Sequence, residues 1–246
     1  MARRDSIGVK GFARRFLDTW QCKSGSACAI CDLDAGRDRI CERCRDVLPW
    51  NDPHCECCGQ PLSSLQPAGV SCDSCQLVRP PFTKARAPLE YGFPVDAIIK
   101  AIKFRRQLSF VPALTGILLQ TLENEFAGVD ALLPVPLHRM RQLQRGFNQS
   151  MELARPLHRA TGLPLVVQAK RTRATMPQTG LDAAERKRNL HGAFAVSGRL
   201  RCRHPLIVDD VITTGETCSQ LAIALLKSGA SDVSVLAVAH AAVSRS

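Results

Sequence analysis

Aromatic side chains and long apolar segments are both scarce in this sequence. Its 246 residues include nine Phe, two Trp and one Tyr, so aliphatic side chains must fill most of the core. No run of residues approaches the roughly 20 apolar positions that a membrane-spanning helix requires. The N-terminal sequence MARRDSIGVKGFARRFLDTWQ is basic and lacks the apolar centre of a secretory signal. We therefore expect a cytoplasmic protein without a membrane span.

Acidic residues are outnumbered by basic ones. Lys and Arg total 33 against 22 Asp and Glu, which gives a formal net charge of +11. Such a balance favours anionic partners, whether nucleic acid, phosphorylated metabolites or a membrane surface, without choosing among them. Within the basic N-terminal segment, residues 1–24, Phe12, Phe16 and Trp20 recur at helical spacing. A short helix packed on its own protein, or a loose terminus, explains this stripe more simply than a membrane-surface helix does.

The composition of the chain changes near residue 80. Residues 25–80 are rich in Cys, Pro and Gly without a long apolar periodicity, whereas residues 81–246 alternate between short apolar runs and helical patterns. Arg79-Pro80-Pro81 interrupts regular structure and indicates a linker between the two parts. The length suits one sizeable domain and one small one. We therefore expect a small cysteine-rich module followed by a larger α/β domain.

The larger domain is predicted to contain a mainly parallel sheet with flanking helices. Strands are expected at residues 85–91, 130–135, 163–168, 193–196, 205–208 and 233–239, and helices at 94–104, 110–122, 149–159 and 216–227. Strands separated by helices imply βαβ units, in which the strands run parallel. Residues 171–190 form a long, polar, Arg-rich segment.

Ten of the twelve cysteines lie between Cys22 and Cys75, and eight of them form four C-x-x-C pairs. In a reducing cytosol, clustered thiols bind metal more often than they form disulfides. Two such pairs make one tetrahedral Cys₄ zinc site, because each pair sits on a tight knuckle that presents two sulfurs to the metal. Pairing in sequence order predicts two structural zinc sites, formed by Cys28, Cys31, Cys41 and Cys44 and by Cys55, Cys58, Cys72 and Cys75.

Spacing alone leaves other uses of these thiols open. Interleaved pairing, a thiol redox module and an empty ligand set are the alternatives. Cys22 and Cys57 fall outside the spacing, and His54 is not needed to complete either set. A closed Cys₄ site has no open position for substrate, so we expect zinc to fold the module and the module to serve as a docking surface.

The segment LIVDDVITTGET, Leu206 to Thr217, carries the sharpest ligand-binding pattern in the chain. An apolar strand ends in Asp209-Asp210, and a Thr/Gly turn then leads into a helix. Ligands of open α/β sheets bind at the carboxyl ends of strands, and N–H groups at a helix start attract anions. Two adjacent carboxylates suit a ribose diol, or a hydrated Mg²⁺ beside it. The hydroxyls of the turn suit phosphate oxygens, although a strand–turn–helix junction with polar caps would share the same residues.

Basic segments elsewhere are predicted to reach the same rim of the sheet. A diphosphate with Mg²⁺ needs several cationic groups, and Arg is the residue that binds phosphate in a bidentate manner. Three segments supply them: KFRR from Lys103, PVPLHRMRQLQRGFNQS at residues 134–150, and RTRATMPQTGLDAAERKRNL at residues 171–190. The ligand-binding candidates are Lys103, Arg105, Val135, Pro136, Arg145, Asn148, Gln149, Arg171, Arg173, Gln178, Arg186 and Asn189. A solvated charged loop or a nucleic-acid patch would use the same kinds of residue.

The strand, acid pair, Thr/Gly turn and helix together resemble the ligand loop of type I phosphoribosyltransferases. The resemblance implies that Asp209 and Asp210 hold the ribose hydroxyls. It also implies that the 5′-phosphate is bound by Thr213, Thr214, Gly215, Glu216 and Thr217. The fold expected from it is the type I phosphoribosyltransferase-like sheet, preceded by the small Cys₄ module.

Over nearly its whole length the chain is similar to the ComF/GntX family. The cysteine pairs, KFRR, the 134–150 segment, the Arg-rich segment and LIVDDVITTGET appear in this order. The family comprises phosphoribosyltransferase-like proteins associated with DNA uptake and the use of external DNA in bacteria. In related transferases, a segment placed like residues 171–190 is a flexible lid over the diphosphate. The resemblance therefore makes Arg171 and Arg173 catalytic candidates beside Asp209 and Asp210.

Two functions stay open on these grounds. The chain is either a phosphoribosyltransferase with an unidentified acceptor, or a ligand sensor or single-stranded-DNA adaptor that retains the pocket. The intact acid pair and the Arg-rich segment favour the enzyme, whereas the zinc module and the net charge favour the adaptor. Single-stranded DNA and DNA-uptake proteins are the expected partners of the zinc module. Because aromatic platforms are few, DNA binding would rest on backbone contacts and depend steeply on salt.

Overall fold

The computed structural model describes residues 27–36, 39–66, 69–172 and 192–241, so the N-terminal segment 1–24 lies outside it. In chain order the elements are α2 (Glu42–Asp46), α3 (Asp73–Leu77), β1 (Lys84–Arg86), β2 (Leu89–Glu90), α4 (Val95–Arg105), η2 (Leu108–Phe110), α5 (Val111–Glu125), β3 (Ala131–Pro134), α6 (Arg139–Arg145), α7 (Gln149–Thr161), β4 (Ala169–Arg171), β5 (Phe194–Val196), β6 (Pro205–Ile212), α9 (Glu216–Lys227) and β7 (Ser234–His240). None of the helices in these parts of the chain has the length and apolar character needed to cross a bilayer.

Five strands form one sheet in which every pairing is parallel. The strand order is β1-β7-β6-β3, and β2 also pairs with β7, beyond the point where β1 ends. β4 and β5 form a separate antiparallel pair. The predicted mainly parallel sheet is therefore confirmed, with β6 and β7 at its centre.

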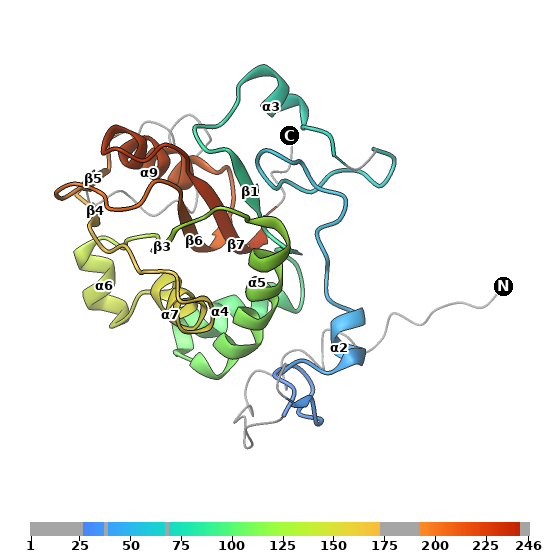
Figure 1. The fold of residues 1–246 in the computed structure, drawn as a ribbon. Helices are drawn as coiled ribbons and strands as arrows, with labels where there is room; N and C mark the ends of the chain where they lie inside the picture. Colours follow the sequence, from blue (N-terminus) through green and yellow to red (C-terminus); the bar gives the residue numbers. More distant parts are fainter. Residues whose placement is uncertain (1–26, 37–38, 67–68, 173–191, 242–246) are drawn as a thin grey trace.

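Helices cover both faces of this sheet. Figure 1 shows α4, α5 and α7 on one side and α9 on the other. Successive residues of β6 follow this division, because side chains of a strand alternate between faces. Leu206 and Val208 belong to the core that contains α4, α5 and α7, whereas Ile207 belongs to the core that contains α9.

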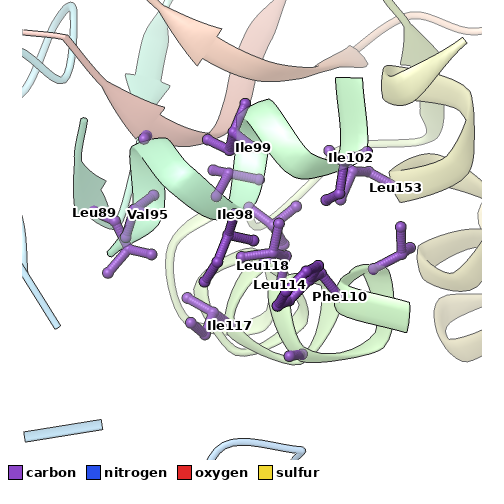
Figure 2. Packing of buried hydrophobic residues seen from close by; sticks show 14 of the residues in the cluster. Leu89, Val95, Ile98, Ile99, Ile102, Phe110, Leu114, Ile117, Leu118 and Leu153 are labelled. Atoms are coloured by element: carbon purple, nitrogen blue, oxygen red, sulfur yellow. The ribbon is translucent and has the colours of Figure 1, made fainter. Parts of the chain in front are cut away.

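The helix predicted at residues 94–104 is α4, and its buried apolar side chains form the centre of the first core. Figure 2 shows Ile98 directed toward Leu114 and Leu118 of α5, and Ile102 beside Leu153 of α7. Each of these side chains is at most 5% exposed. Burial of a Leu or Ile side chain contributes about 1.5–3 kcal/mol, so this packing fixes α4 firmly on the sheet. The basic end of α4, including Lys103, is thereby held close to the end of β6.

Three strand predictions differ from the structure. The strand predicted at 85–91 is interrupted at Ala87 and Pro88, so β1 and β2 pair separately with β7. Residues 163–168 do not form a strand but make one bridge, in which the N–H of Leu132 donates to Pro164 and the N–H of Val166 donates to Leu132, both at 2.8 Å. Pro164 has no N–H with which to extend the ladder. The strand predicted at 205–208 continues to Ile212, because β7 pairs with it beyond the acid pair.

Three helices were not predicted, namely α2, α3 and α6. They are five, five and seven residues long, which is too short for an apolar periodicity to show. α6 lies within the basic segment at residues 134–150 and carries Arg141 and Arg145 on one helix rather than on a loop.

The cysteine-rich part of the chain joins the sheet along the β2 edge. Trp50 pairs antiparallel with Leu89, and the N–H of Glu90 donates to the carbonyl of Pro49 at 2.7 Å. The N–H of Asn51 donates in turn to the carbonyl of Pro88 at 2.9 Å. Residues 49–51, which separate the two cysteine sets, therefore cover an edge that would otherwise expose unpaired backbone groups.

Asn51 connects three segments at this junction. Its side chain is fully buried, and Nδ2 donates to the carbonyls of Gly59 and Ala87 at 2.8 Å each. The backbone carbonyl of Asn51 accepts from Nη1 of Arg86 at 2.8 Å. Arg86 also forms an ion pair with Glu125 at the end of α5. Asn51 thus ties the cysteine-rich part to both β1 and α5.

The second cysteine set also approaches β1 closely. The N–H of Ala85 donates to the carbonyl of Cys57 at 2.8 Å. Gly59 has φ +70°, and a Cβ at this position would lie 2.9 Å from the carbonyl oxygen of Ala85. Only glycine allows this backbone approach without displacing the strand.

Replacing Asn51 by Ala should lower the free energy of unfolding by about 1–3 kcal/mol, because the carbonyl of Gly59 loses its donor and that of Ala87 keeps only the longer bond from Nη1 of Arg86, at 3.4 Å. Urea denaturation in zinc-containing buffer measures the change. As a control, Glu123→Ala removes an exposed side chain of α5 and should change stability by no more than about 0.5 kcal/mol. An Asn51→Ala protein as stable as the parent would show that this junction is not a source of stability.

Candidate functional site

The predicted ligand loop lies at the carboxyl end of the central strands. β6 carries Asp209 and Asp210 within the strand, and residues 213–215 then turn into α9. Gly215 has φ +73°, and a Cβ there would meet no atom within 4 Å. The turn is therefore open on the side of the pocket that Thr213, Gly215 and Thr217 border. An open helix start of this kind can accept a phosphate group.

Both carboxylates of the acid pair interact with neighbouring groups. Oδ1 of Asp209 accepts from the Ser150 hydroxyl at 3.0 Å and from the N–H of Asp210 at 2.9 Å. Oδ2 of Asp210 lies 2.7 Å from Nζ of Lys103. Burial, followed by the negative charge of Asp210, raises the pKa of Asp209 to about 7, although these hydrogen bonds and Lys103 oppose the shift. Near neutral pH, Asp209 can therefore donate or accept a hydrogen bond.

Three arginines border the same pocket, which has a volume of about 290 Å³. Arg141 and Arg145 come from α6, and Arg171 comes from the end of β4. Burial lowers the pKa of Arg171 to about 10, and nearby Arg141 contributes to the shift while Asp209 opposes it. Burial also lowers the pKa of Arg145. Guanidinium groups that are brought together and partly removed from water gain most from an anion with several oxygens.

Gln149 adds a neutral donor to the pocket. This side chain is 4% exposed, and its Nε2 has no hydrogen-bond partner among the described residues. The start of α7 is positioned by Asn148, whose Nδ2 donates to the carbonyl of Val135 and whose Oδ1 accepts from the N–H of Ser150, both at 3.0 Å. A buried amide without a partner costs free energy, and Nε2 is closed off from solvent in this conformation, so a ligand oxygen would satisfy it only once the side chain turns toward the pocket.

The structure brings many of the predicted residues together and leaves others apart. The pocket is bordered by Lys103, Val135, Arg145, Gln149, Arg171, Asp209, Asp210, Thr213, Gly215 and Thr217. Thr214 and Glu216 border a second cavity, and Pro136 and Asn148 border a third. Arg105 is exposed at the end of α4. The remaining candidates, Arg173, Gln178, Arg186 and Asn189, lie outside the described residues.

Several pocket residues were not among the site predictions. Arg141 lies one helical turn before Arg145, so knowledge of α6 would have revealed it. Tyr91 reaches the pocket because the strand before it pairs with β7, which no local pattern shows. Cys218 is buried in the first turns of α9, where its apolar neighbours conceal it in the sequence.

The eight paired cysteines form two compact groups in sequence order, which excludes interleaved pairing. In each group the four Sγ atoms all lie within 4.8 Å of one another. A tetrahedral zinc with Zn–S bonds of about 2.3 Å places its sulfurs about 3.8 Å apart. Sγ of Cys31 and Cys41 are 3.5 Å apart, and those of Cys58 and Cys72 are 3.8 Å apart. Both groups are therefore consistent with a structural zinc ion.

Backbone N–H groups favour the thiolate form at one cysteine of each group. Burial would raise the pKa of Cys28, but the N–H groups of Cys41 and Ile30, at 3.3 and 3.4 Å from its Sγ, lower it to about 7. In the second group, Cys55 Sγ accepts from the N–H of Cys72 at 3.2 Å, and its pKa is lowered despite burial. The thiolate is the form that binds zinc, so these bonds prepare both groups for metal.

Asp209→Asn should stabilise the ligand-free protein increasingly as pH rises from about 4 to about 7, and by a constant amount above that. The folded-state pKa of Asp209 is raised to about 7, whereas the unfolded value is about 4. Ionisation therefore costs the folded state stability as pH rises through this window, at about 1.4 kcal/mol per pKa unit. Urea denaturation at a series of pH values measures the difference between variant and parent.

The exposed Asp46→Asn serves as the control for this series and should show no such trend. A stability difference for Asp209→Asn that does not change with pH would contradict the raised pKa.

Comparison with known proteins agrees with both parts of the structure. Residues 25–76 match the family described as Double zinc ribbon domain. DNA utilization protein YhgH of Escherichia coli (strain K12) is 35% identical over 216 residues, covering 85% of this chain and 94% of that protein. Competence protein F of Haemophilus influenzae is 30% identical over 219 residues, with coverages of 85% and 94%. Competence protein ComFC of Bacillus subtilis is 25% identical over 230 residues, with coverages of 82% and 89%. The chain belongs to the ComF family, which includes competence protein F and DNA utilization protein YhgH.

Proposed function

We propose that the pocket around Asp209 and Asp210 binds a phosphoribosyl diphosphate or a related phosphorylated sugar, and that the protein acts in the uptake or utilisation of DNA. The observation that carries the ligand class is the meeting of an acid pair, an open Thr/Gly helix start and three arginines in one pocket. The names of the relatives, DNA utilization protein and competence protein, support the cellular role.

Each part of the pocket suits one part of such a ligand. The carboxylates of Asp209 and Asp210 accept from a ribose diol, which has two donors at adjacent carbons. The hydroxyls and N–H groups from Thr213 to Thr217 bind the 5′-phosphate. Arg145 and Arg171, with Arg141, bind the diphosphate oxygens. Mg²⁺ bound to the diphosphate would supply further charge neutralisation.

A site of this composition supports phosphoribosyl transfer. In that reaction a nucleophile forms a bond to C1 of the ribose while the C1–O bond to diphosphate breaks. Diphosphate leaves with the electron pair, and the nucleophile loses a proton. The proposed role of Arg171, and of Arg173 outside the described residues, is to stabilise the charge that develops on diphosphate. Asp209 and Asp210 hold the ribose in position.

The alternative is a ligand sensor or single-stranded-DNA adaptor that binds the same sugar phosphate without turnover. The net charge of +11 favours this candidate, because a basic surface attracts the phosphate backbone. The zinc-ribbon part would then serve as the docking surface for DNA or for DNA-uptake proteins. Both candidates place the protein in the cytoplasm and share the pocket, and they are told apart at the pocket by whether the ligand is consumed.

The zinc-loaded protein should bind ribose 5-phosphate about tenfold more tightly than 2-deoxyribose 5-phosphate, because the deoxy sugar leaves one carboxylate without its donor. Asp209→Asn/Asp210→Asn should bind ribose 5-phosphate at least tenfold more weakly and lose the preference between the sugars. Isothermal titration calorimetry measures all four affinities. Equal affinities for the two sugars, together with unchanged affinities in Asp209→Asn/Asp210→Asn, would overturn the assignment of the acid pair.

Turnover is tested with phosphoribosyl diphosphate and Mg²⁺, with and without candidate bases, by following diphosphate release. Release that requires Asp209 and Asp210 supports the transferase, and binding without release supports the sensor.

We further propose that residues 25–80 form a double zinc ribbon that holds two structural zinc ions, ahead of a ligand-binding domain at residues 81–246.

Purified under reducing conditions, the protein should contain two zinc ions per chain. Cys28→Ser/Cys31→Ser should remove one of them, because two thiolates remain in the first group. Cys57→Ser is the matched control and should retain both, since Cys57 hydrogen-bonds to Ser71 outside the second group. Metal analysis by mass spectrometry decides the matter, and a parent protein with fewer than two ions would contradict the proposal.

A further inference from the structure

A second cavity, of about 670 Å³, lies on the other side of the ligand loop from the acid-pair pocket. Thr213 and Gly215 border both spaces, whereas Asp209 and Asp210 border only the first. One wall of the second cavity comes from the linker between Val78 and Phe82, next to the second cysteine group. The opposite wall is the half-buried side of α9 that carries Glu216, Ser219, Gln220 and Ile223. Its size falls within the range of small-molecule sites, about 300–1,000 Å³.

The walls of this cavity are mainly apolar. Val78, Pro81 and Phe82 face it from the linker, and Ile223 faces it from α9. Charges of both signs lie at its border: Arg79 on the linker, and Glu216, whose carboxylate accepts from Gln220 at 2.9 Å. Cys58, Cys72 and Cys75 of the second cysteine group also border the cavity. A mainly apolar cavity without an excess of basic groups suits a neutral molecule better than the anion expected in the first pocket.

His240 supplies one oriented polar atom to the cavity. Its side chain is 3% exposed, at the last residue of β7. Nδ1 lies 3.1 Å from the carbonyl oxygen of Ala241, which can only accept, so Nδ1 carries the proton of the neutral ring. Burial lowers the pKa of His240 to about 4, which keeps the ring neutral near pH 7. Nε2 therefore presents a lone pair.

This lone pair makes no hydrogen bond to any residue in the described parts of the chain. Nε2 keeps some contact with solvent, and His240 borders the second cavity. The cavity thus combines mainly apolar walls with a buried, uncharged hydrogen-bond acceptor at Nε2 of His240, in addition to the more exposed polar groups at its border. Its complement is a molecule with an apolar face and one N–H donor.

We propose that this cavity is a second ligand site, which binds a small neutral heteroaromatic ring whose N–H group donates to Nε2 of His240. The ring packs between the linker side chains Pro81 and Phe82 and Ile223 of α9. The site is assembled from both parts of the chain, because the linker that walls it is held by the second cysteine group. It does not depend on the sugar-phosphate proposal, since among the described residues the two spaces share only Ile212, Thr213 and Gly215 and neither carboxylate of the acid pair.

The test uses three probes with the full-length, zinc-loaded protein. Benzimidazole carries an N–H donor, 5-methylbenzimidazole keeps the donor and adds one methyl group, and 1-methylbenzimidazole loses the donor at the same size. The two donors should bind about tenfold more tightly than 1-methylbenzimidazole, because only they satisfy the buried acceptor. In protein labelled with ¹⁵N at histidine, only the donors should shift the Nε2 resonance of His240.

Two variants locate the binding site. His240→Phe should abolish the tenfold preference, whereas His240→Gln, whose side-chain carbonyl can accept, should restore part of it. Because His240 lies in a central strand, Ser219→Phe provides a change on the surface of α9 and should weaken all three probes by filling the cavity.

Equal binding of benzimidazole and 1-methylbenzimidazole, an unmoved Nε2 resonance, or no binding at millimolar probe would each overturn the proposal. Titration of the same samples with ribose 5-phosphate separates these outcomes from a failure of the acid-pair pocket.

Discussion

Two adjacent carboxylates inside a central parallel strand determine which groups the neighbouring helices must place beside them. β6 continues past Asp209 and Asp210 because β7 pairs with Val211 and Ile212, so the carboxylates are held in the sheet rather than on a loose turn. Ionisation of Asp209 is costly there, as its raised pKa shows. The surrounding helices supply compensating groups, the Ser150 hydroxyl from α7 and the ammonium of Lys103 from α4. Buried acid pairs whose ionisation destabilises the fold are typical of binding sites.

The cysteine-rich part is joined to the sheet by backbone hydrogen bonds and does not form a separate unit. Residues 49–51 cover the β2 edge, Asn51 connects this segment to β1, and Gly59 allows the second cysteine group to approach Ala85. An uncovered parallel edge would invite pairing with another chain. Metal held by the two cysteine groups would therefore stabilise an edge of the sheet, in addition to folding the ribbons themselves.

The ligand loop separates two chemically different spaces. On one side lie the acid pair and the arginines, which suit a charged sugar phosphate. On the other lie apolar linker side chains and a neutral histidine, which suit an uncharged ring. Because Thr213 and Gly215 border both, an occupant of either space contacts the same turn. The turn therefore lies between the acid-pair pocket and the cavity that the linker and the second cysteine group border.

The sequence by itself determined the features that depend on local spacing. Four C-x-x-C pairs predicted two metal groups, the apolar stripe of α4 predicted its buried face, and LIVDDVITTGET predicted the acid pair and the helix start. Tertiary structure alone decided that residues 163–168 make only one bridge, that Tyr91 reaches the pocket, and that the linker and α9 enclose a second cavity around His240. The physical reason is that periodicity records which face of one element is buried. Strand order, pairing length and cavity walls arise instead from contacts between segments far apart in the chain, and no local pattern encodes these.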